Sequence, residues 1–124
     1  MSGTAIRVMV FEDDFLLAGT LADVLVRLGC QVGSCVGSYD EAMKAADTEQ
    51  CDLAVVDLEL RGMMAYPILD RLEARGIAYI MSTSTVRSDI PDRYRAAPLL
   101  SKPYTIDQLR AAIERMLATD DPLT

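Results

Sequence analysis

Residues 53–57, Leu-Ala-Val-Val-Asp, decide the fold, because a short unbroken apolar run ends there on a carboxylate. Similar segments occur at residues 8–11, which precede Glu12 and Asp13, and at Leu99-Leu100, which precede Ser101, Lys102 and Pro103. Such runs are typical of strands in a parallel sheet that is buried on both faces. Because the carboxyl ends of these strands share one edge of an open sheet, we expect their polar ends to converge.

Helical patterns alternate with these apolar segments along the chain. The expected strands are residues 6–11, 31–37, 53–58, 78–82 and 99–101, with the second strand at an edge. The first expected helix has an apolar stripe over residues 17–28 and stops at Gly29. The next two cover residues 38–49 and 66–74. A short helix over 91–95 is limited by Pro91, and the last has an apolar stripe over 106–117. Ser38 with Glu41 and Thr105 with Gln108 form capping boxes. This order predicts an α/β, doubly wound parallel sheet with helices on both faces.

Composition narrows the function classes. The 124 residues fit a single domain, 1–124, with 119–124 expected to fray. A net charge of −7 argues against nucleic acid and anionic membrane as partners, and no apolar run spans a bilayer. We see no secretion signal, and we interpret the three scattered cysteines as reduced, partly buried thiols of a cytoplasmic protein. Histidine is absent, which excludes Ser-His and Cys-His catalysis.

The converging strand ends suggest a magnesium site built around a nucleophilic aspartate. Asp57 taken alone is more readily explained as a solvated loop acid or a helix cap, but Glu12 and Asp13 end the neighbouring first strand and favour a functional role. Carboxylates so close repel one another, and Mg²⁺, a hard cation, relieves that repulsion. An aspartate beside Mg²⁺ can attack a phosphoryl group, and Lys102, otherwise an ordinary surface charge, would pair with its oxygens.

The fourth strand adds a hydroxyl to the same edge. Thr83 follows it directly, although Ser82, Ser84 and Thr85 make an ordinary turn residue the competing interpretation.

Taken in order, these residues resemble the receiver domain of bacterial two-component response regulators over essentially the full length of the chain. The matching pieces are Val8-Met9-Val10-Phe11-Glu12-Asp13-Asp14, Asp52-Leu53-Ala54-Val55-Val56-Asp57-Leu58, Thr83, and Ser101-Lys102-Pro103-Tyr104. The resemblance implies a flavodoxin-like five-stranded sheet of order 2-1-3-4-5. It also implies a phosphoacceptor that takes a phosphoryl group from a sensor histidine kinase.

Carried over residue by residue, the resemblance implies that Asp57 is the phosphoacceptor. Glu12 and Asp13 would bind Mg²⁺, together with Asp57 and the backbone carbonyl of Glu59. Asp14 is a rival for the second acid, but choosing it would shift the strand register by one residue. Thr83 would hydrogen-bond the phosphoryl group, Lys102 would pair with it, and the bond between Lys102 and Pro103 would be cis.

Two features depart from the family pattern. Leu99 replaces the aromatic residue that usually lies three positions before the lysine and rotates inward on phosphorylation. The segment from Thr83 to Lys102 is also too short for a full fourth helix. Both features are similar to a subgroup of stand-alone receivers named for a Phe-Ala-Thr-Gly-x-Tyr stretch, which Met81-Ser82-Thr83-Ser84-Thr85 matches loosely.

We therefore expect a stand-alone receiver without an output domain. It would act as a switch or a phosphate sink rather than as a turnover enzyme, and would signal by contact with a downstream protein that the sequence does not name. The competing hypotheses are a degenerate receiver that serves only as a binding module and a small haloacid-dehalogenase-like phosphatase. The second also uses an aspartate nucleophile at a strand end, and Asp57 and Glu59 superficially match its paired acids.

Overall fold

The computed structural model describes residues 5–84 and 89–119. Five strands form one parallel sheet in the order β2-β1-β3-β6-β7, which is the predicted order 2-1-3-4-5 once a small separate hairpin is set aside. The strands are β1 (Arg7–Phe11), β2 (Gln31–Val36), β3 (Leu53–Asp57), β6 (Ala78–Thr83) and β7 (Leu99–Ser101). The predicted fold class is confirmed, and β2 lies at a sheet edge as expected.

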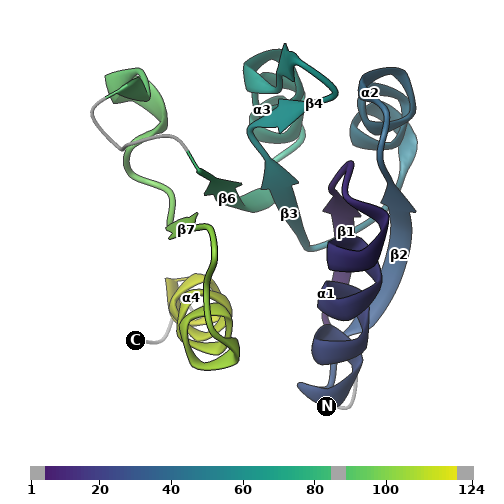
Figure 1. The fold of residues 1–124 in the computed structure, drawn as a ribbon, viewed down its shortest axis with the longest axis vertical. Helices are drawn as coiled ribbons and strands as arrows, with labels where there is room; N and C mark the ends of the chain where they lie inside the picture. The colour runs from purple at the N-terminus through teal and green to yellow at the C-terminus, as the bar shows by residue number, and fades with distance from the viewer. Residues whose placement is uncertain (1–4, 85–88, 120–124) are drawn as a thin grey trace.

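Helices cover both faces of the sheet. They are α1 (Phe15–Arg27), α2 (Tyr39–Thr48), α3 (Tyr66–Ala74) and α4 (Ile106–Thr119). Figure 1 shows α1 and α4 on one side of the strands and α2 and α3 on the other. Helix α4 includes Thr119, the first residue of the predicted frayed tail, and residues 120–124 lie outside the described part of the chain.

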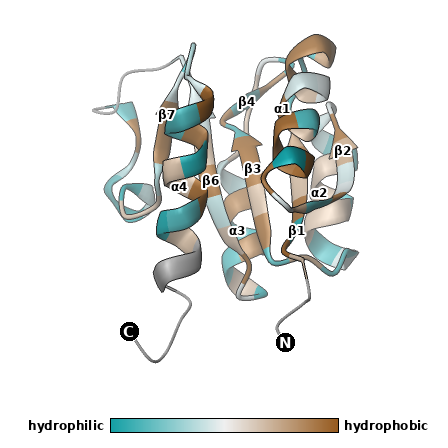
Figure 2. Cartoon of the chain, turned by 90° about the horizontal axis from the view of Figure 1, so that it is seen from below, coloured by the Kyte–Doolittle hydropathy of each residue, from teal (hydrophilic) through white to brown (hydrophobic). Residues whose placement is uncertain are grey.

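Strand side chains divide between two cores by strict alternation. In β3, Leu53 and Val55 pack with α1 and α4, whereas Ala54 and Val56 pack with α2 and α3. Figure 2 shows the resulting hydrophobic strands enclosed between the helices. Full burial of such an aliphatic side chain contributes about 1.5–3 kcal/mol. Because both strand faces are buried, the strands read in the sequence as unbroken apolar runs.

Helix ends follow the sequence signals closely. Gly29, with φ of 93°, follows the end of α1, as the predicted C-cap requires. In the capping box of α4, the Gln108 amide donates to Thr105 Oγ1 at 3.1 Å and the Thr105 amide to Gln108 Oε1 at 2.7 Å. The segment that Pro91 limits forms the 3₁₀ turn η2 (Asp92–Tyr94), and the Lys102–Pro103 bond is cis, as predicted.

The prediction of a loop without strands between β3 and α3 is wrong. Strands β4 (Glu59–Leu60) and β5 (Met63–Met64) form a two-residue antiparallel hairpin there. At its turn, φ is 50° for Arg61 and 86° for Gly62, which is typical of a type I′ turn.

Two further observations bear on the sequence predictions. Cys30, Cys35 and Cys51 are free thiols, but Cys35 is exposed rather than partly buried. Within residues 5–84 and 89–119, no helix is both long and apolar enough to cross a lipid bilayer.

Candidate active site

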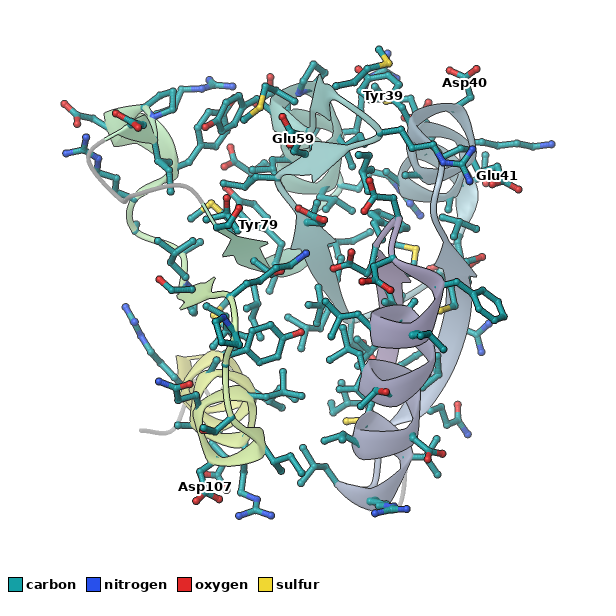
Figure 3. All side chains as sticks on the ribbon, in the orientation of Figure 1. Tyr39, Asp40, Glu41, Glu59, Tyr79 and Asp107 are labelled. Carbon is teal, nitrogen blue, oxygen red and sulfur yellow. The ribbon has the colours of Figure 1, made fainter. Side chains whose placement is uncertain are left out.

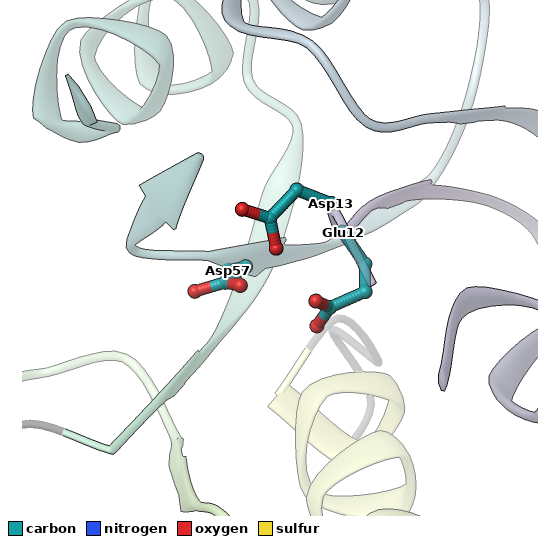
Figure 4. A group of neighbouring side chains, drawn as sticks. All are labelled: Glu12, Asp13 and Asp57. Atoms are coloured by element: carbon teal, nitrogen blue, oxygen red, sulfur yellow. The ribbon is translucent and has the colours of Figure 1, made fainter. Parts of the chain in front are cut away.

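Three carboxylates meet at the carboxyl edge of the sheet. Glu12 and Asp13 follow β1, Asp57 ends the adjacent strand β3, and one oxygen from each lies within 4.8 Å of the others. Figure 4 shows the three side chains directed toward a common space. Glu12 is only 4% exposed and Asp57 only 6%, so their mutual repulsion is weakly screened by water.

A glycine on the neighbouring strand end lets the acidic segment sit close to the sheet. The Glu12 amide donates to the Val36 carbonyl at 3.0 Å, and Gly37 follows Val36 directly. A Cβ at Gly37 would lie 3.1 Å from the Glu12 carbonyl oxygen and 3.3 Å from Asp13 Cα. This positioning role was not predictable from the sequence, because a glycine at the end of an edge strand is also the ordinary start of a turn.

Asp14 does not join the cluster. Its carboxylate caps α1, where Oδ1 accepts hydrogen bonds from the Leu16 amide at 3.0 Å and the Leu17 amide at 3.1 Å. The Asp14 amide in turn donates to Glu12 Oε2 at 3.0 Å. The structure therefore favours Glu12 over Asp14 as the second acid of the site.

Lys102 supplies the ammonium of the site. Its Nζ lies 2.9 Å from Glu12 Oε1 and 3.0 Å from Asp57 Oδ2, and its amide donates to the Thr83 carbonyl at 2.9 Å. Thr83 itself ends β6 and is buried, whereas Ser84 is exposed and Thr85 lies outside the described residues. The structure thus gathers the predicted lysine and two of the predicted acids into one hydrogen-bonded group.

Burial and pairing perturb the pKa values of Glu12 and Lys102. Burial raises the pKa of Glu12, although hydrogen bonds from Lys102 and the Asp14 amide act in the opposite direction. Burial disfavours the charged form of Lys102, but its hydrogen bonds to Glu12 and Asp57 outweigh this and raise its pKa. Three carboxylates around one ammonium leave an excess of negative charge, which a cation would relieve.

The β4–β5 hairpin contacts two of the three acids through its backbone. The Glu59 amide donates to Asp57 Oδ1 at 3.0 Å, and the Arg61 amide donates to Asp13 Oδ2 at 2.8 Å. Within an extended strand the N–H and C=O groups of one residue point to the same side. The Glu59 carbonyl therefore faces the Asp57 side of the hairpin, and the Glu59 residue is exposed beyond the end of β3 (Figure 3).

Leu99, which occupies the position of the expected aromatic residue, starts β7. It is half-buried and packs against the core formed with α2 and α3. Leu99 therefore packs in the core and supplies no polar group to the acidic cluster.

The family model and the curated relatives that match this chain point to the same family. The model of the response regulator receiver domain matches residues 8–114. The transcriptional regulatory protein TctD of Salmonella typhimurium is 31% identical over 116 residues, which cover 90% of this chain and 51% of TctD. The chain spans about half the length of the curated relatives it matches.

Solved structures agree in fold. The solution structure of SdrG from Sphingomonas melonis Fr1 is 29% identical, with a TM-score of 0.81 and coverage of 94% of this chain and 99% of SdrG. SdrG is also known in a BeF₃-activated conformation, with a TM-score of 0.77. The receiver domain of PhyR from Erythrobacter litoralis has a TM-score of 0.82 at 20% identity, covers 98% of both chains, and supports the fold alone.

Proposed function

This chain belongs to the response regulator receiver domain family, and from that premise we propose that it accepts a phosphoryl group onto Asp57 from a histidine kinase. One observation carries the proposal: Asp57 is held by Lys102 at 3.0 Å within a cluster of three carboxylates that approach to 4.8 Å. A structural ion pair would not need two further acids beside it. A phosphoryl-transfer site needs both kinds of charge.

The donor set fits Mg²⁺, which prefers oxygen ligands and one or two carboxylates in a shell completed by water and phosphate oxygens. Asp13, Asp57 and the Glu59 carbonyl would hold the ion, with Glu12 beside them. Mg²⁺ would neutralise negative charge as the phosphoryl group approaches. The hydrogen bonds from the Arg61 amide to Asp13 and from the Glu59 amide to Asp57 orient these ligands.

Transfer forms one bond and breaks another. An Asp57 carboxylate oxygen attacks phosphorus, and the bond between phosphorus and the donor breaks. The electron pair of that bond leaves with the nitrogen of the phosphohistidine. With acetyl phosphate as the donor, it leaves with the acetate oxygen. Lys102 then follows the added negative charge onto a phosphoryl oxygen, and the Thr83 hydroxyl donates to another. The protein returns to its resting state by hydrolysis and acts as a switch rather than as a turnover enzyme.

We propose protein contact as the route by which the phosphorylated domain passes on its state. Most of the curated relatives are named as transcriptional regulatory proteins, and they are about twice as long as this chain, so their outputs are not transferred to it. With Leu99 at the usual aromatic position, the change of surface must arise elsewhere. Membership of the family argues against the phosphatase hypothesis.

The test is intact mass after incubation with Mg²⁺ and acetyl phosphate. Wild type should gain one phosphoryl group, and both Asp57→Asn and chelation by EDTA should abolish the gain. Asp40→Asn, which removes an exposed carboxylate on α2, is the matched control and should behave as wild type. A protein without adduct and without Mg²⁺ binding would be a degenerate receiver, and the proposal would fail. Rapid phosphate release without adduct would restore the phosphatase hypothesis.

A further inference from the structure

A buried hydroxyl lies beside the phosphoacceptor without a partner. Ser82 is 2% exposed, and its Oγ has no hydrogen-bond partner within residues 5–84 and 89–119. Leaving a buried hydroxyl unpaired costs about 1–3 kcal/mol. A residue that brings this penalty into the centre of a sheet needs an explanation that packing does not give, since alanine would fit the same space without it.

Sheet register places Ser82 between the partners of the site. Its Cα pairs with Asp57 on one side and with Leu100 on the other. Alternation along the strands puts Asp57, Ser82 and Leu100 on the face that α1 and α4 cover, because Val55, Ile80 and Leu100 belong to that core. Adjacent strands are about 4.8 Å apart, so Ser82 is the nearest β6 neighbour of Asp57 on this face.

Lys102 has to cross β6 to reach Asp57. It follows β7, and β6 separates β7 from β3 in the sheet (Figure 1). Its side chain therefore passes over the end of β6, where Ser82 faces the same side. An ammonium has three N–H donors, and two of them are used by Glu12 and Asp57. The third donor of Lys102 and the Oγ of Ser82, which has no partner among the described residues, thus have complementary chemistry and lie on the same face of the sheet.

We propose that Ser82 is a positioning residue for Lys102 in the phosphorylated state. When Lys102 turns from the Asp57 carboxylate to a phosphoryl oxygen, the Ser82 hydroxyl accepts its third N–H and donates its own hydrogen to the remaining carbonyl oxygen of Asp57. The hydroxyl is unpaired in the resting protein and paired in the phosphorylated one. Ser82 therefore favours the phosphorylated state. The Tyr104 hydroxyl is also buried and unpartnered among the described residues, but no strand register sets it against Asp57.

This inference rests on the proposed function, and the test separates the two. The probe is beryllofluoride with Mg²⁺, and the measured quantity is its dissociation constant. Ser82→Ala should weaken binding about tenfold, the effect of losing one hydrogen bond to a charged group. Ser82→Thr and Ser82→Val have nearly the same shape and differ in the hydroxyl, so the threonine variant should bind about tenfold more tightly than the valine variant. Ser101→Ala, an exposed serine that ends β7, is the control and should bind as wild type.

The outcomes are distinct. If wild type binds beryllofluoride and Asp57→Asn does not, the proposed function stands. Equal binding by wild type, Ser82→Ala and Ser82→Val would then overturn the role of Ser82, whatever their melting temperatures. If wild type itself does not bind, both proposals fall. The unaltered protein gives a check that does not depend on folding of the variants: a slowly exchanging Ser82 hydroxyl proton should become visible by NMR on adding Mg²⁺ and beryllofluoride, and its absence would also overturn the inference.

Discussion

Replacing Lys102 by methionine should make the resting protein less stable and at the same time make it bind Mg²⁺ more tightly. Methionine keeps the length of the apolar stem and removes the ammonium. The Glu12 and Asp57 carboxylates, which Lys102 contacts at 2.9 and 3.0 Å, then keep their burial and lose their cation. Their hydrogen bonds from the Asp14 and Glu59 amides remain.

The magnitude follows from the geometry. Removing one partner of a fully buried ion pair costs about 3–5 kcal/mol. Here the Lys102 side chain is 23% exposed, so water reaches part of the group and lowers this cost. We expect a loss of about 2–3 kcal/mol in the free energy of unfolding at pH 7 without Mg²⁺. Charges about 4 Å apart near a protein surface interact by several kcal/mol, so removing this cation should tighten Mg²⁺ binding at least about tenfold.

The loss should also depend on pH. The pKa of Glu12 should rise further without the ammonium, because the hydrogen bond from Lys102 no longer opposes the effect of burial. A carboxyl group whose pKa is higher in the folded than in the unfolded state favours folding when it is protonated. The stability of Lys102→Met should therefore rise as the pH falls from neutral through the raised pKa, and level off below the unfolded value near 4.5. Wild type should show a smaller change over the same range.

Urea unfolding at several pH values, with EDTA and with Mg²⁺, measures all three effects. Lys44→Met removes an exposed lysine from α2 and should match wild type throughout. If Lys102→Met is as stable as wild type in EDTA at pH 7, Lys102 does not stabilise the folded protein by neutralising the buried acids. If Mg²⁺ stabilises the variant no more than it stabilises wild type, the ion and the ammonium do not share a site.

Two further substitutions test how the acids are held. Gly37→Ala should lower the free energy of unfolding by about 1–2 kcal/mol and weaken Mg²⁺ binding, because the added Cβ would lie 3.1 Å from the Glu12 carbonyl oxygen. Gly19→Ala is the control. Because Gly19 lies in α1 with open space around it, this substitution should stabilise the protein by about 0.5–1 kcal/mol. Urea unfolding and Mg²⁺ titration compare the pair, and equal stability of both would refute the close approach. The raised pKa of Glu12 makes its ionisation favour the unfolded state, so the stability of wild type should fall as the pH rises above about 4.5. In Glu12→Gln this fall should disappear. An unchanged dependence of stability on pH would count against the role of Glu12.

The strands and the acids were predictable from the sequence for the same reason. A strand buried on both faces must be apolar throughout, and the first charged residue after it marks its carboxyl end. Asp57, Glu12 and Lys102 therefore indicate the site edge from the sequence alone. Helices α2 and α4 were equally predictable, because the capping boxes at their starts are local signals.

The missed features depend on contacts between distant segments. Strands β4 and β5 have two residues each, too few for a periodic pattern, and Arg61 is an uncommon residue at positive φ. The importance of Gly37 appears only when β2 lies beside the end of β1. Ser82 could be placed in a strand, but its unpaired hydroxyl is a property of the assembled sheet.

The edge of the sheet that carries the acids opposes folding, whereas the two cores on its faces favour it. Three carboxylates converge and the pKa of Glu12 is raised at the carboxyl ends of β1 and β3. At the end of β6, Ser82 Oγ has no partner among the described residues, and in the adjoining β4–β5 turn Arg61 adopts a positive φ. Each of these costs falls on the resting state, and the proposed binding of a cation and a phosphoryl group would relieve the charge-related ones. A ligand that relieves strain already present in the protein needs few new contacts to shift its conformation. If Asp57 accepts a phosphoryl group as proposed, that group would therefore act on the chain through the local groups around Asp57, even though Leu99 occupies the position of the expected aromatic residue.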